Sequence, residues 1–256
     1  MIEKIVQNST LALIPARGGS KGVPHKNIRL LKGFPLVAYS IALAKMSESI
    51  QRVIVSTDSV EIAEIAEKFG AEVPFMRPAD FSGDKSPDYE FVNHALNWLA
   101  VHEGSIPEYV IHLRPTTPLR TPEIVDRAVM QFKENQVATS LRSGHKASES
   151  PFKWFIKNEK NFFQSIAKGI SNEDANAGRQ KFPIVYIPDG YVDVIKTEFV
   201  VNHEILHGEK MLAFESPVCY EVDEEEDFML LEYQIQKESS ILYEYLMKNY
   251  SDLHVD

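Results

Sequence analysis

The sequence has very little cysteine: Cys219 is the only one among 256 residues. A single thiol excludes an intramolecular disulfide and any metal site built from several cysteines. No run of apolar residues approaches the ~18 that a membrane-spanning helix needs, and residues 1–10 are too polar for a secretory signal peptide. These absences predict a cytoplasmic protein with no membrane partner.

Positive charge is also scarce. Lys and Arg together number 27 against 37 Asp and Glu, and the formal net charge is −10 at pH 7. Proteins that bind the phosphate backbone of nucleic acids need a basic surface, so we expect no nucleic-acid partner. With 44% hydrophobic residues, no internal repeat and no low-complexity linker, residues 1–256 predict a single α/β domain.

The most distinctive stretch covers residues 11–27. Residues 11–14 form an apolar run typical of a short buried strand. The loop after it combines glycines, which let backbone N–H groups turn toward one point, with basic side chains. These residues are Gly18, Gly19 and Gly22, and Arg17, Lys21, His25 and Lys26. A strand, a basic glycine-rich loop and then a helix predict a phosphate site; the alternative is a basic surface turn.

Hydrophobic periodicity divides the rest of the chain into alternating strands and helices. Further strands are predicted at 52–58, 71–75, 109–113, 137–142 and 191–195. Helices are predicted at 36–46, 59–70, 89–102, 122–135 and 228–250. Strand, helix and strand at this spacing are typical of parallel βαβ units, so the pattern favours an α/β fold with a mostly parallel sheet.

The segment of about 143–189 departs from that pattern, because it is aromatic, basic and less regular. Its large aromatic side chains are Phe152, Trp154, Phe155, Phe162 and Phe163. Exposed aromatic patches usually have a partner. We therefore interpret this segment as an excursion from the domain that forms an interface.

Two carboxylates near the end of the chain indicate a metal site. Residues 218–223 are predicted to end a strand, on which Glu221 and Asp223 share a face because side chains alternate. Two carboxylates one strand step apart, opposite a phosphate loop, can hold Mg²⁺ or Mn²⁺. The acidic residues 224–227 have a simpler interpretation as the start of a helix, where negative charge is favoured.

Three motifs resemble those of a known family. They are the run 14–22 followed by Lys26 and Asn27, the Pro-Thr-Thr-Pro-Leu-Arg turn at 115–120, and the segment 218–228. Together they resemble the acylneuraminate cytidylyltransferases, the CMP-sialic acid synthetases and their relatives. Those enzymes join CMP from CTP to the anomeric hydroxyl of a 2-keto-3-deoxy sugar acid and release pyrophosphate. The resemblance implies a Rossmann-like sheet flanked by helices, of the nucleotide-diphospho-sugar transferase type, with a dimerisation excursion and a homodimer.

The resemblance also implies roles for particular residues. The expected contacts of CTP are Ala16, Arg17, Gly18, Ser20, Lys21, Asn27, Arg77, Ser86 and Asp88. The expected contacts of a sialic-acid-like nonulosonic acid are Arg114, Thr116, Lys146, Arg179 and Asp189. The expected catalytic residues are Arg17, Lys21 and Asp223, and the expected metal ligands are Asp223 and Glu221. In-line attack on the α-phosphorus then needs mainly positioning and neutralisation of charge.

Four residues depart from the family's pattern. Arg114 stands where sialic acid synthetases often have Gln, Asp189 replaces the usual Asn, Glu221 replaces Asp, and Asp88 stands where many relatives have Ser or Thr. Asp88 is as readily a helix-start residue as a base contact, and we interpret Arg120 as structural. Two alternatives stay open: a related transferase for another sugar acid or nucleotide, and a non-catalytic nucleotide-binding homologue.

Overall fold

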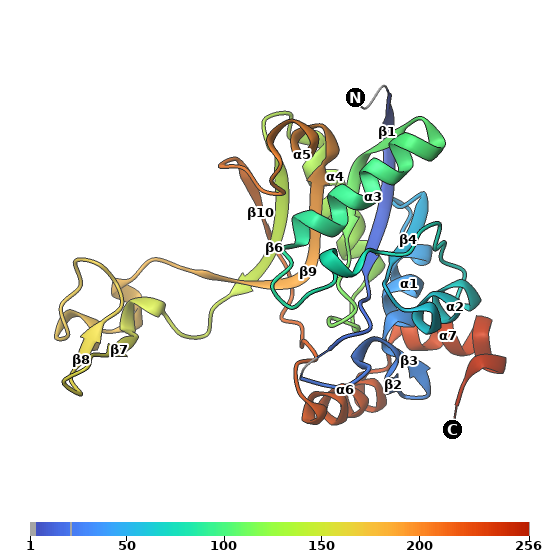
Figure 1. Cartoon of the computed structure of the whole chain (residues 1–256). Helices are drawn as coiled ribbons and strands as arrows, with labels where there is room; N and C mark the ends of the chain where they lie inside the picture. The colour runs from blue at the N-terminus through green and yellow to red at the C-terminus, as the bar shows by residue number, and fades with distance from the viewer. Residues whose placement is uncertain (1–3, 21, 256) are drawn as a thin grey trace.

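The computed structural model of the chain describes residues 4–20 and 22–255. In this part of the chain, six strands form the central sheet in the order β10-β6-β9-β5-β1-β4 (Figure 1). Their bounds are β1 Ile5–Pro15, β4 Arg52–Ser56, β5 Ile106–His112, β6 Ser140–Lys146, β9 Tyr186–Lys196 and β10 Met211–Glu215. β1 is parallel to β4 and β5, and β10 to β6, whereas β9 is antiparallel to its neighbours. The predicted α/β fold with a mostly parallel sheet is confirmed.

The centre of the sheet is apolar on both faces. Along β1, Ala12 and Ile14 belong to one hydrophobic core, and Leu11 and Leu13 to a second. All four are at most 2% exposed. A strand covered on both sides reads as a continuous apolar run, which explains why this segment is recognisable in the sequence.

Helices cover both faces. Those that contribute to the first core are α1 Leu36–Met46, α2 Val60–Lys68, α4 Pro122–Glu134, α6 Glu225–Glu238 and α7 Ile241–Tyr250. Those that contribute to the second are α3 Asp88–Glu103 and α5 Thr197–His203. A short hairpin, β2 Leu30–Leu31 and β3 Phe34–Pro35, precedes α1. Among the described residues, no helix has the length and apolar character needed to cross a membrane.

Three strands deliver the loops that follow them to one edge of the sheet. Because β1 is parallel to β4 and β5, the strand ends Pro15, Ser56 and His112 lie at the same edge. β9 runs in the opposite direction beside β5 and pairs Asp193 with His112. This edge therefore receives the glycine-rich loop, the turn after β5 and a carboxylate from β9.

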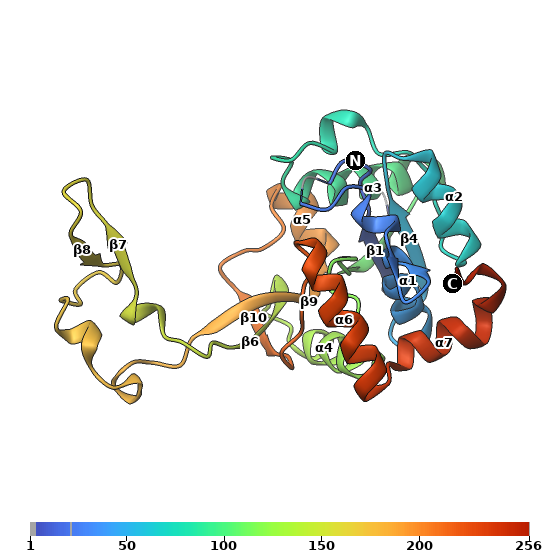
Figure 2. The same ribbon diagram turned by 90° about the horizontal axis from the view of Figure 1, so that it is seen from below.

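β6 and β9 continue past the body of the protein as a two-stranded ribbon. Their last pairs run from Gly144↔Pro188 to Lys146↔Tyr186. Residues 147–185, which we call the arm, project away from the sheet (Figures 1 and 2). The arm holds a small hairpin, β7 Phe155–Lys157 and β8 Phe163–Ser165. Phe162 is 68% exposed there, so the arm presents large apolar side chains to solvent.

The strand predicted at 71–75 is wrong. This segment makes only isolated bridges beside β4, at Glu72 and Met76. Pro74 lies between them and lacks the N–H that a continuous ladder needs. β4 is consequently the last regular strand at this side of the described sheet.

The strand end predicted at 218–223 is also wrong, because these residues are irregular. Their backbone nevertheless reaches the edge of the sheet, where the Val222 N–H donates to the Thr116 carbonyl over 2.8 Å. Glu221 and Asp223 are therefore not placed by strand alternation. β10 and α5, which precede this segment, lie where the sequence analysis predicts no element.

The single helix predicted at 228–250 is two helices, α6 and α7. Ser239, between them, has φ +49° and ψ 150°. The Ser240 side chain accepts a hydrogen bond from the Tyr243 N–H and so starts α7. The positive φ of Ser239 thus ends α6, and the Ser240 side chain caps α7.

The backbone angle at Ser239 predicts a stabilising substitution. Glycine adopts this region without the steric cost that a Cβ brings, so Ser239→Gly should raise the free energy of unfolding by about 1 kcal/mol. Urea unfolding measures the change. The control Ser239→Ala keeps the Cβ and should bring no gain; equal values for the two variants would contradict the prediction.

Candidate active site

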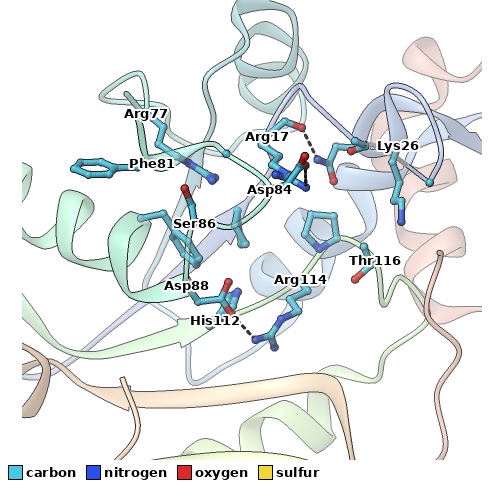
Figure 3. A pocket seen from close by; sticks show the side chains of 17 residues that line it. Arg17, Lys26, Arg77, Phe81, Asp84, Ser86, Asp88, His112, Arg114 and Thr116 are labelled. Carbon is cyan, nitrogen blue, oxygen red and sulfur yellow. Dashed lines mark hydrogen bonds and ion pairs between the residues drawn. The ribbon is translucent and has the colours of Figure 1, made fainter. Parts of the chain in front are cut away.

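A cavity of about 480 Å³ opens at the carboxyl edge of β1 and β5 (Figure 3). In the described part of the chain, three segments line it: the loop after β1, residues 77–91 and the strand end at 112–116. The basic side chains in its lining are Arg17, Lys26, Arg77 and Arg114. On a protein of net charge −10, a cavity with this lining fits a small anionic ligand.

The loop after β1 is held by its own polar groups. The Asn27 side chain donates to the Arg17 carbonyl over 2.9 Å, and the Gly18 N–H donates to the Asp58 carboxylate over 2.8 Å. Ser20 and Asn27 line the cavity, whereas Ala16 is buried and bonds to the Ser56 carbonyl. Lys21, which was predicted to contact phosphate, lies outside the described residues.

The loop packs closely on the segment that carries the predicted metal ligands. A Cβ at Gly22 would lie 2.3 Å from the Asp223 carbonyl oxygen, so only glycine fits there without displacement. The Lys26 ammonium donates to the Val222 carbonyl over 2.6 Å and lies 3.6 Å from an Asp223 carboxylate oxygen. Asp223 is 78% exposed. The structure therefore brings the basic loop and this carboxylate together.

The segment after β4 covers one side of the cavity. Arg17 forms an ion pair with Asp84, with 2.9 Å between Nη2 and Oδ1, and donates to the Ser82 carbonyl over 3.3 Å. Ser86 lines the cavity as predicted for the base-binding segment, while its hydroxyl donates to the Asp80 carbonyl. The segment thus reaches Arg17 directly from the far side of the cavity.

Arg77 is tied to the sheet. Its guanidinium donates to the Ser56 carbonyl and hydroxyl and lies 5.2 Å from the centre of the Phe91 ring. Burial lowers its pKa to about 10. These contacts support the segment that follows, and the side chain also forms part of the cavity lining.

Arg114 lies between two carboxylates. Its Nη1 donates to Asp193 over 2.9 Å. Its Nη2 donates to Asp88 over 2.8 Å (Figure 3). Burial opposes its charge, but Asp193 and Asp88 outweigh that effect and raise its pKa. Arg114 and Thr116 both line the cavity. Of the five predicted sugar contacts, the structure places these two in the cavity.

Arg120 fixes the turn after β5. It is 2% exposed and donates to the carbonyl oxygens of Arg114 and Tyr191, each over 3.1 Å, and to the Ser40 hydroxyl. Burial lowers its pKa to about 10. These bonds agree with its interpretation as a structural residue, since they join the turn to α1 and β9.

Lys146, Arg179 and Asp189 lie outside this cavity. Lys146 pairs with Glu215 at 3.0 Å, and Arg179 donates to the Ala147 carbonyl over 2.8 Å at the base of the arm. Asp189 is 3% exposed and accepts from the hydroxyls of Ser143 and Ser216.

Two polar residues of the site were missed by sequence reasoning, His112 and Asp193. His112 is fully buried, 3.7 Å from Asp193, and its ring meets that of Phe91 edge to face. Asp193 is 1% exposed. Each is a polar residue in an apolar strand, His112 in β5 and Asp193 in β9, and this was the available signal in the sequence. Only the pairing of β5 with β9 shows that the two residues meet.

The residues at the predicted metal site fit a magnesium ion that takes its other ligands from water and phosphate. Among the described residues, no three His, Cys, Asp or Glu side chains are grouped to hold a metal by themselves. Burial, and then the charge of Asp223, raises the pKa of Glu221. Two carboxylates that repel each other beside a basic loop suit Mg²⁺, which usually keeps one or two protein carboxylates plus phosphate oxygens.

The buried His112 predicts a pH dependence of stability. Burial, and then the charge of Arg114, lowers its pKa well below the ordinary value. In the unfolded chain its pKa is about 6.5, so below that pH the unfolded state binds the extra proton. The stability contribution of neutral His112 is therefore present above pH 6.5 and is lost as the pH falls below it, by up to about 1.4 kcal/mol per pH unit.

Urea unfolding of the wild type and His112→Asn between pH 5 and 8 measures this effect. The difference in unfolding free energy between the two should shrink as the pH falls below about 6.5. The same substitution at the exposed His203 controls for the loss of a surface imidazole. A difference that stays constant over the whole pH range would show that His112 does not titrate on unfolding.

Comparisons with known proteins bear on the family of this chain. A family model described as Cytidylyltransferase matches residues 11–249. The chain is 30% identical to the post-translational flagellin modification protein B of Campylobacter coli, over 90% of this chain and 96% of that protein. It is also 30% identical to the CMP-N,N'-diacetyllegionaminic acid synthase of Campylobacter jejuni, over 88% of this chain and 94% of that one.

A solved structure shows the same fold. The CMP:2-keto-3-deoxy-manno-octonic acid synthetase complexed with CTP superposes with a TM-score of 0.66, covering 90% of this chain and 99% of that one at 15% identity. The match of the family model over almost the whole chain, together with the relatives at 30% identity, confirms the resemblance seen in the motifs. This chain belongs to the cytidylyltransferase family.

Proposed function

We propose that the protein transfers CMP from CTP to the anomeric hydroxyl of a sialic-acid-like nonulosonic acid and releases pyrophosphate. The observation that carries this proposal is the cavity lined by Arg17, Lys26, Arg77 and Arg114, because both substrates are anions. Both substrates are small molecules in solution. We therefore propose that the protein acts in the cytoplasm, without a nucleic-acid or membrane partner.

In the proposed reaction, the triphosphate lies against the loop after β1. The sugar hydroxyl oxygen bonds to the α-phosphorus, the bond from that phosphorus to the pyrophosphate oxygen breaks, and the hydroxyl proton is released. Arg17 and Lys21 neutralise charge on the phosphates, and Asn27 holds the loop through the Arg17 carbonyl. Arg77 and the segment of Ser86 contribute to the pocket for the base.

Asp223, with Glu221, would hold Mg²⁺ or Mn²⁺ beside this loop. A divalent cation there supplies charge neutralisation for the phosphate oxygens and the leaving pyrophosphate. The protein's own part would be to place the Asp223 carboxylate. The close packing of the Asp223 backbone on Gly22 and the hydrogen bond from Lys26 to the Val222 carbonyl support that role.

The sugar acid would lie toward Arg114 and Thr116, and the arm of a second copy would complete its site. Two observations support a homodimer of this kind. Lys146 and Arg179 lie outside the cavity of their own chain, and the arm exposes Phe162 and Phe163 at 68% and 64%. Aromatic side chains of this size are enriched at interfaces.

The names of the relatives define which acids to test. They include N,N'-diacetyllegionaminic acid for the Campylobacter jejuni relative and, at 40% identity over 49% of this chain, pseudaminic acid for another. An N-acylneuraminate cytidylyltransferase of Escherichia coli is 28% identical over 88% of this chain. We propose a nonulosonic acid of this group as the substrate.

Pyrophosphate release from CTP and Mg²⁺ tests the reaction. The panel comprises N,N'-diacetyllegionaminic acid, pseudaminic acid, an N-acylneuraminic acid and 2-keto-3-deoxy-manno-octonic acid. We expect release with at least one acid, and a loss of about 100-fold or more in Lys21→Ala and in Asp223→Asn, since each removes a charge that acts on the phosphates. Glu64→Gln, at an exposed position on α2, should release pyrophosphate at the wild-type rate.

Binding of CTP without release for any acid would favour a nucleotide-binding role without catalysis. Release with a nucleotide other than CTP would favour a related transferase. Full activity of the Asp223→Asn variant would show that Asp223 is not a required metal ligand.

The arm gives a second prediction. Replacing Phe162 and Phe163 together by Ser removes the apolar surface proposed for the interface, so we expect a monomer by sedimentation and a loss of about tenfold or more in kcat/KM for the sugar acid. Met130→Ser, at an exposed apolar position on α4 that is 58% exposed, is the control and should leave both unchanged. A double variant that stays dimeric and fully active would contradict the proposed interface.

A further inference from the structure

The two carboxylates that hold Arg114 differ sharply in burial. Asp193 is 1% exposed, whereas Asp88 is 45% exposed. Each takes a different nitrogen of the guanidinium, Nη1 for Asp193 and Nη2 for Asp88. The side chain of Arg114 itself is 21% exposed. One partner is thus enclosed in the protein and the other faces the cavity.

The inner pair is permanent. Asp193 comes from the middle of β9, and its carboxylate lies 3.7 Å from both His112 and the Arg142 Nε. Separating a carboxylate from its cation inside the protein is strongly unfavourable, because a buried unpaired charge remains. Asp193 therefore keeps Arg114 at the edge of the cavity whatever the other nitrogen binds.

The outer pair can separate. Asp88 is the first residue of α3, and at that position its carboxylate is favoured by the positive end of the helix. It lines the cavity and is half exposed, so water can solvate it when it leaves Arg114. The pair is only partly buried, so it contributes less to stability than a fully enclosed pair would. Breaking it strands no charge, in contrast to breaking the inner pair.

A second ion pair with an outer carboxylate lies at the other end of the cavity. Arg17 pairs with Asp84, which is 38% exposed. Asp84 and Asp88 belong to one segment, which runs from the end of the 3-10 helix Ala79–Phe81 to the start of α3. Two arginines that face the cavity are therefore each paired with a carboxylate of this segment.

We propose that Asp88 is an internal stand-in for the carboxylate of the sugar acid, which displaces it from Arg114 while Asp193 keeps the guanidinium in place. This inference rests on the proposed function and names the group by which that site recognises its acid. A guanidinium offers several donors in a fixed plane and binds one carboxylate on each side. The substrate's carboxylate replaces Asp88 like for like, so recognition requires that negative charge.

The inference gives Asp88 a role different from the base contact predicted from the sequence. As a contact of the cytosine base, Asp88 would contribute to binding of CTP, and its removal would lower the affinity for CTP. As a stand-in, it competes with the sugar acid, and its removal strengthens binding of that acid. The two roles therefore predict opposite consequences for different substrates.

Asp88→Asn tests the inference, because it removes the charge and keeps the shape. Calorimetry without CTP measures binding of each acid in the panel described above and of its methyl ester, in which the carboxylate is blocked. We expect the dissociation constant of at least one free acid to fall about fivefold or more in the variant, and those of the esters to stay unchanged. The affinity for CTP should stay within twofold.

Asp84→Asn is the matched control, since it makes the same change in the same segment beside Arg17. If Asp84→Asn raises the affinity for the sugar acid as much as Asp88→Asn does, the effect comes from the general loss of negative charge, and the inference fails. The inference also fails if Asp88→Asn raises the affinity for no acid, or raises the affinities for acid and ester equally. It fails as well if the variant lowers the affinity for CTP instead.

These measurements separate the inference from the proposed reaction. Pyrophosphate release by the wild type with no tightening in Asp88→Asn leaves the reaction standing and overturns the stand-in. If Asp88→Asn binds a free acid more tightly but the wild type releases no pyrophosphate, the stand-in is supported and the proposed reaction is overturned.

Discussion

The positive charge of Arg114 is the constraint on which the site depends. Its backbone carbonyl accepts from Arg120 and Ser40, and its guanidinium is held by the buried Asp193. Asp193 reaches it only because β9 runs antiparallel beside β5 with Asp193 opposite His112. One antiparallel strand in a mostly parallel sheet thus delivers a carboxylate to the edge where ligand-binding loops of such sheets lie.

Local signals in the sequence were sufficient for the parts of the fold that depend on neighbours in the chain. The strand at 11–14 is apolar because both faces are covered, and α1 has the predicted bounds. The break at Ser239 and the loss of a strand at 71–75 were missed, because helical periodicity hides a two-serine stop and one proline ends a ladder. β10 and α5 carry no clear periodic signal.

The site was predictable where it lies in one loop and less so where distant strands meet. The run after β1 indicated an anion site from its glycines and cations, and Arg17, Ser20 and Asn27 do line a cavity. Asp193 and His112 escaped notice because their meaning depends on a strand pairing. Roles for Lys146, Arg179 and Asp189 came from family resemblance, and a single chain places these residues away from the cavity. Their part in sugar binding stays a prediction.

The placement of the arm has a consequence for how this family can diversify. The arm leaves the body through β6 and returns through β9, which are neighbours in the sheet. A segment whose ends are adjacent can lengthen, shorten or change its sequence while the sheet keeps its register, because the closing entropy grows only slowly with length. The loop after β1 and the segment after β4, which line the cavity, are separate from the arm. Selection can therefore alter the arm while the cavity at the carboxyl edge of β1 and β5 stays unchanged.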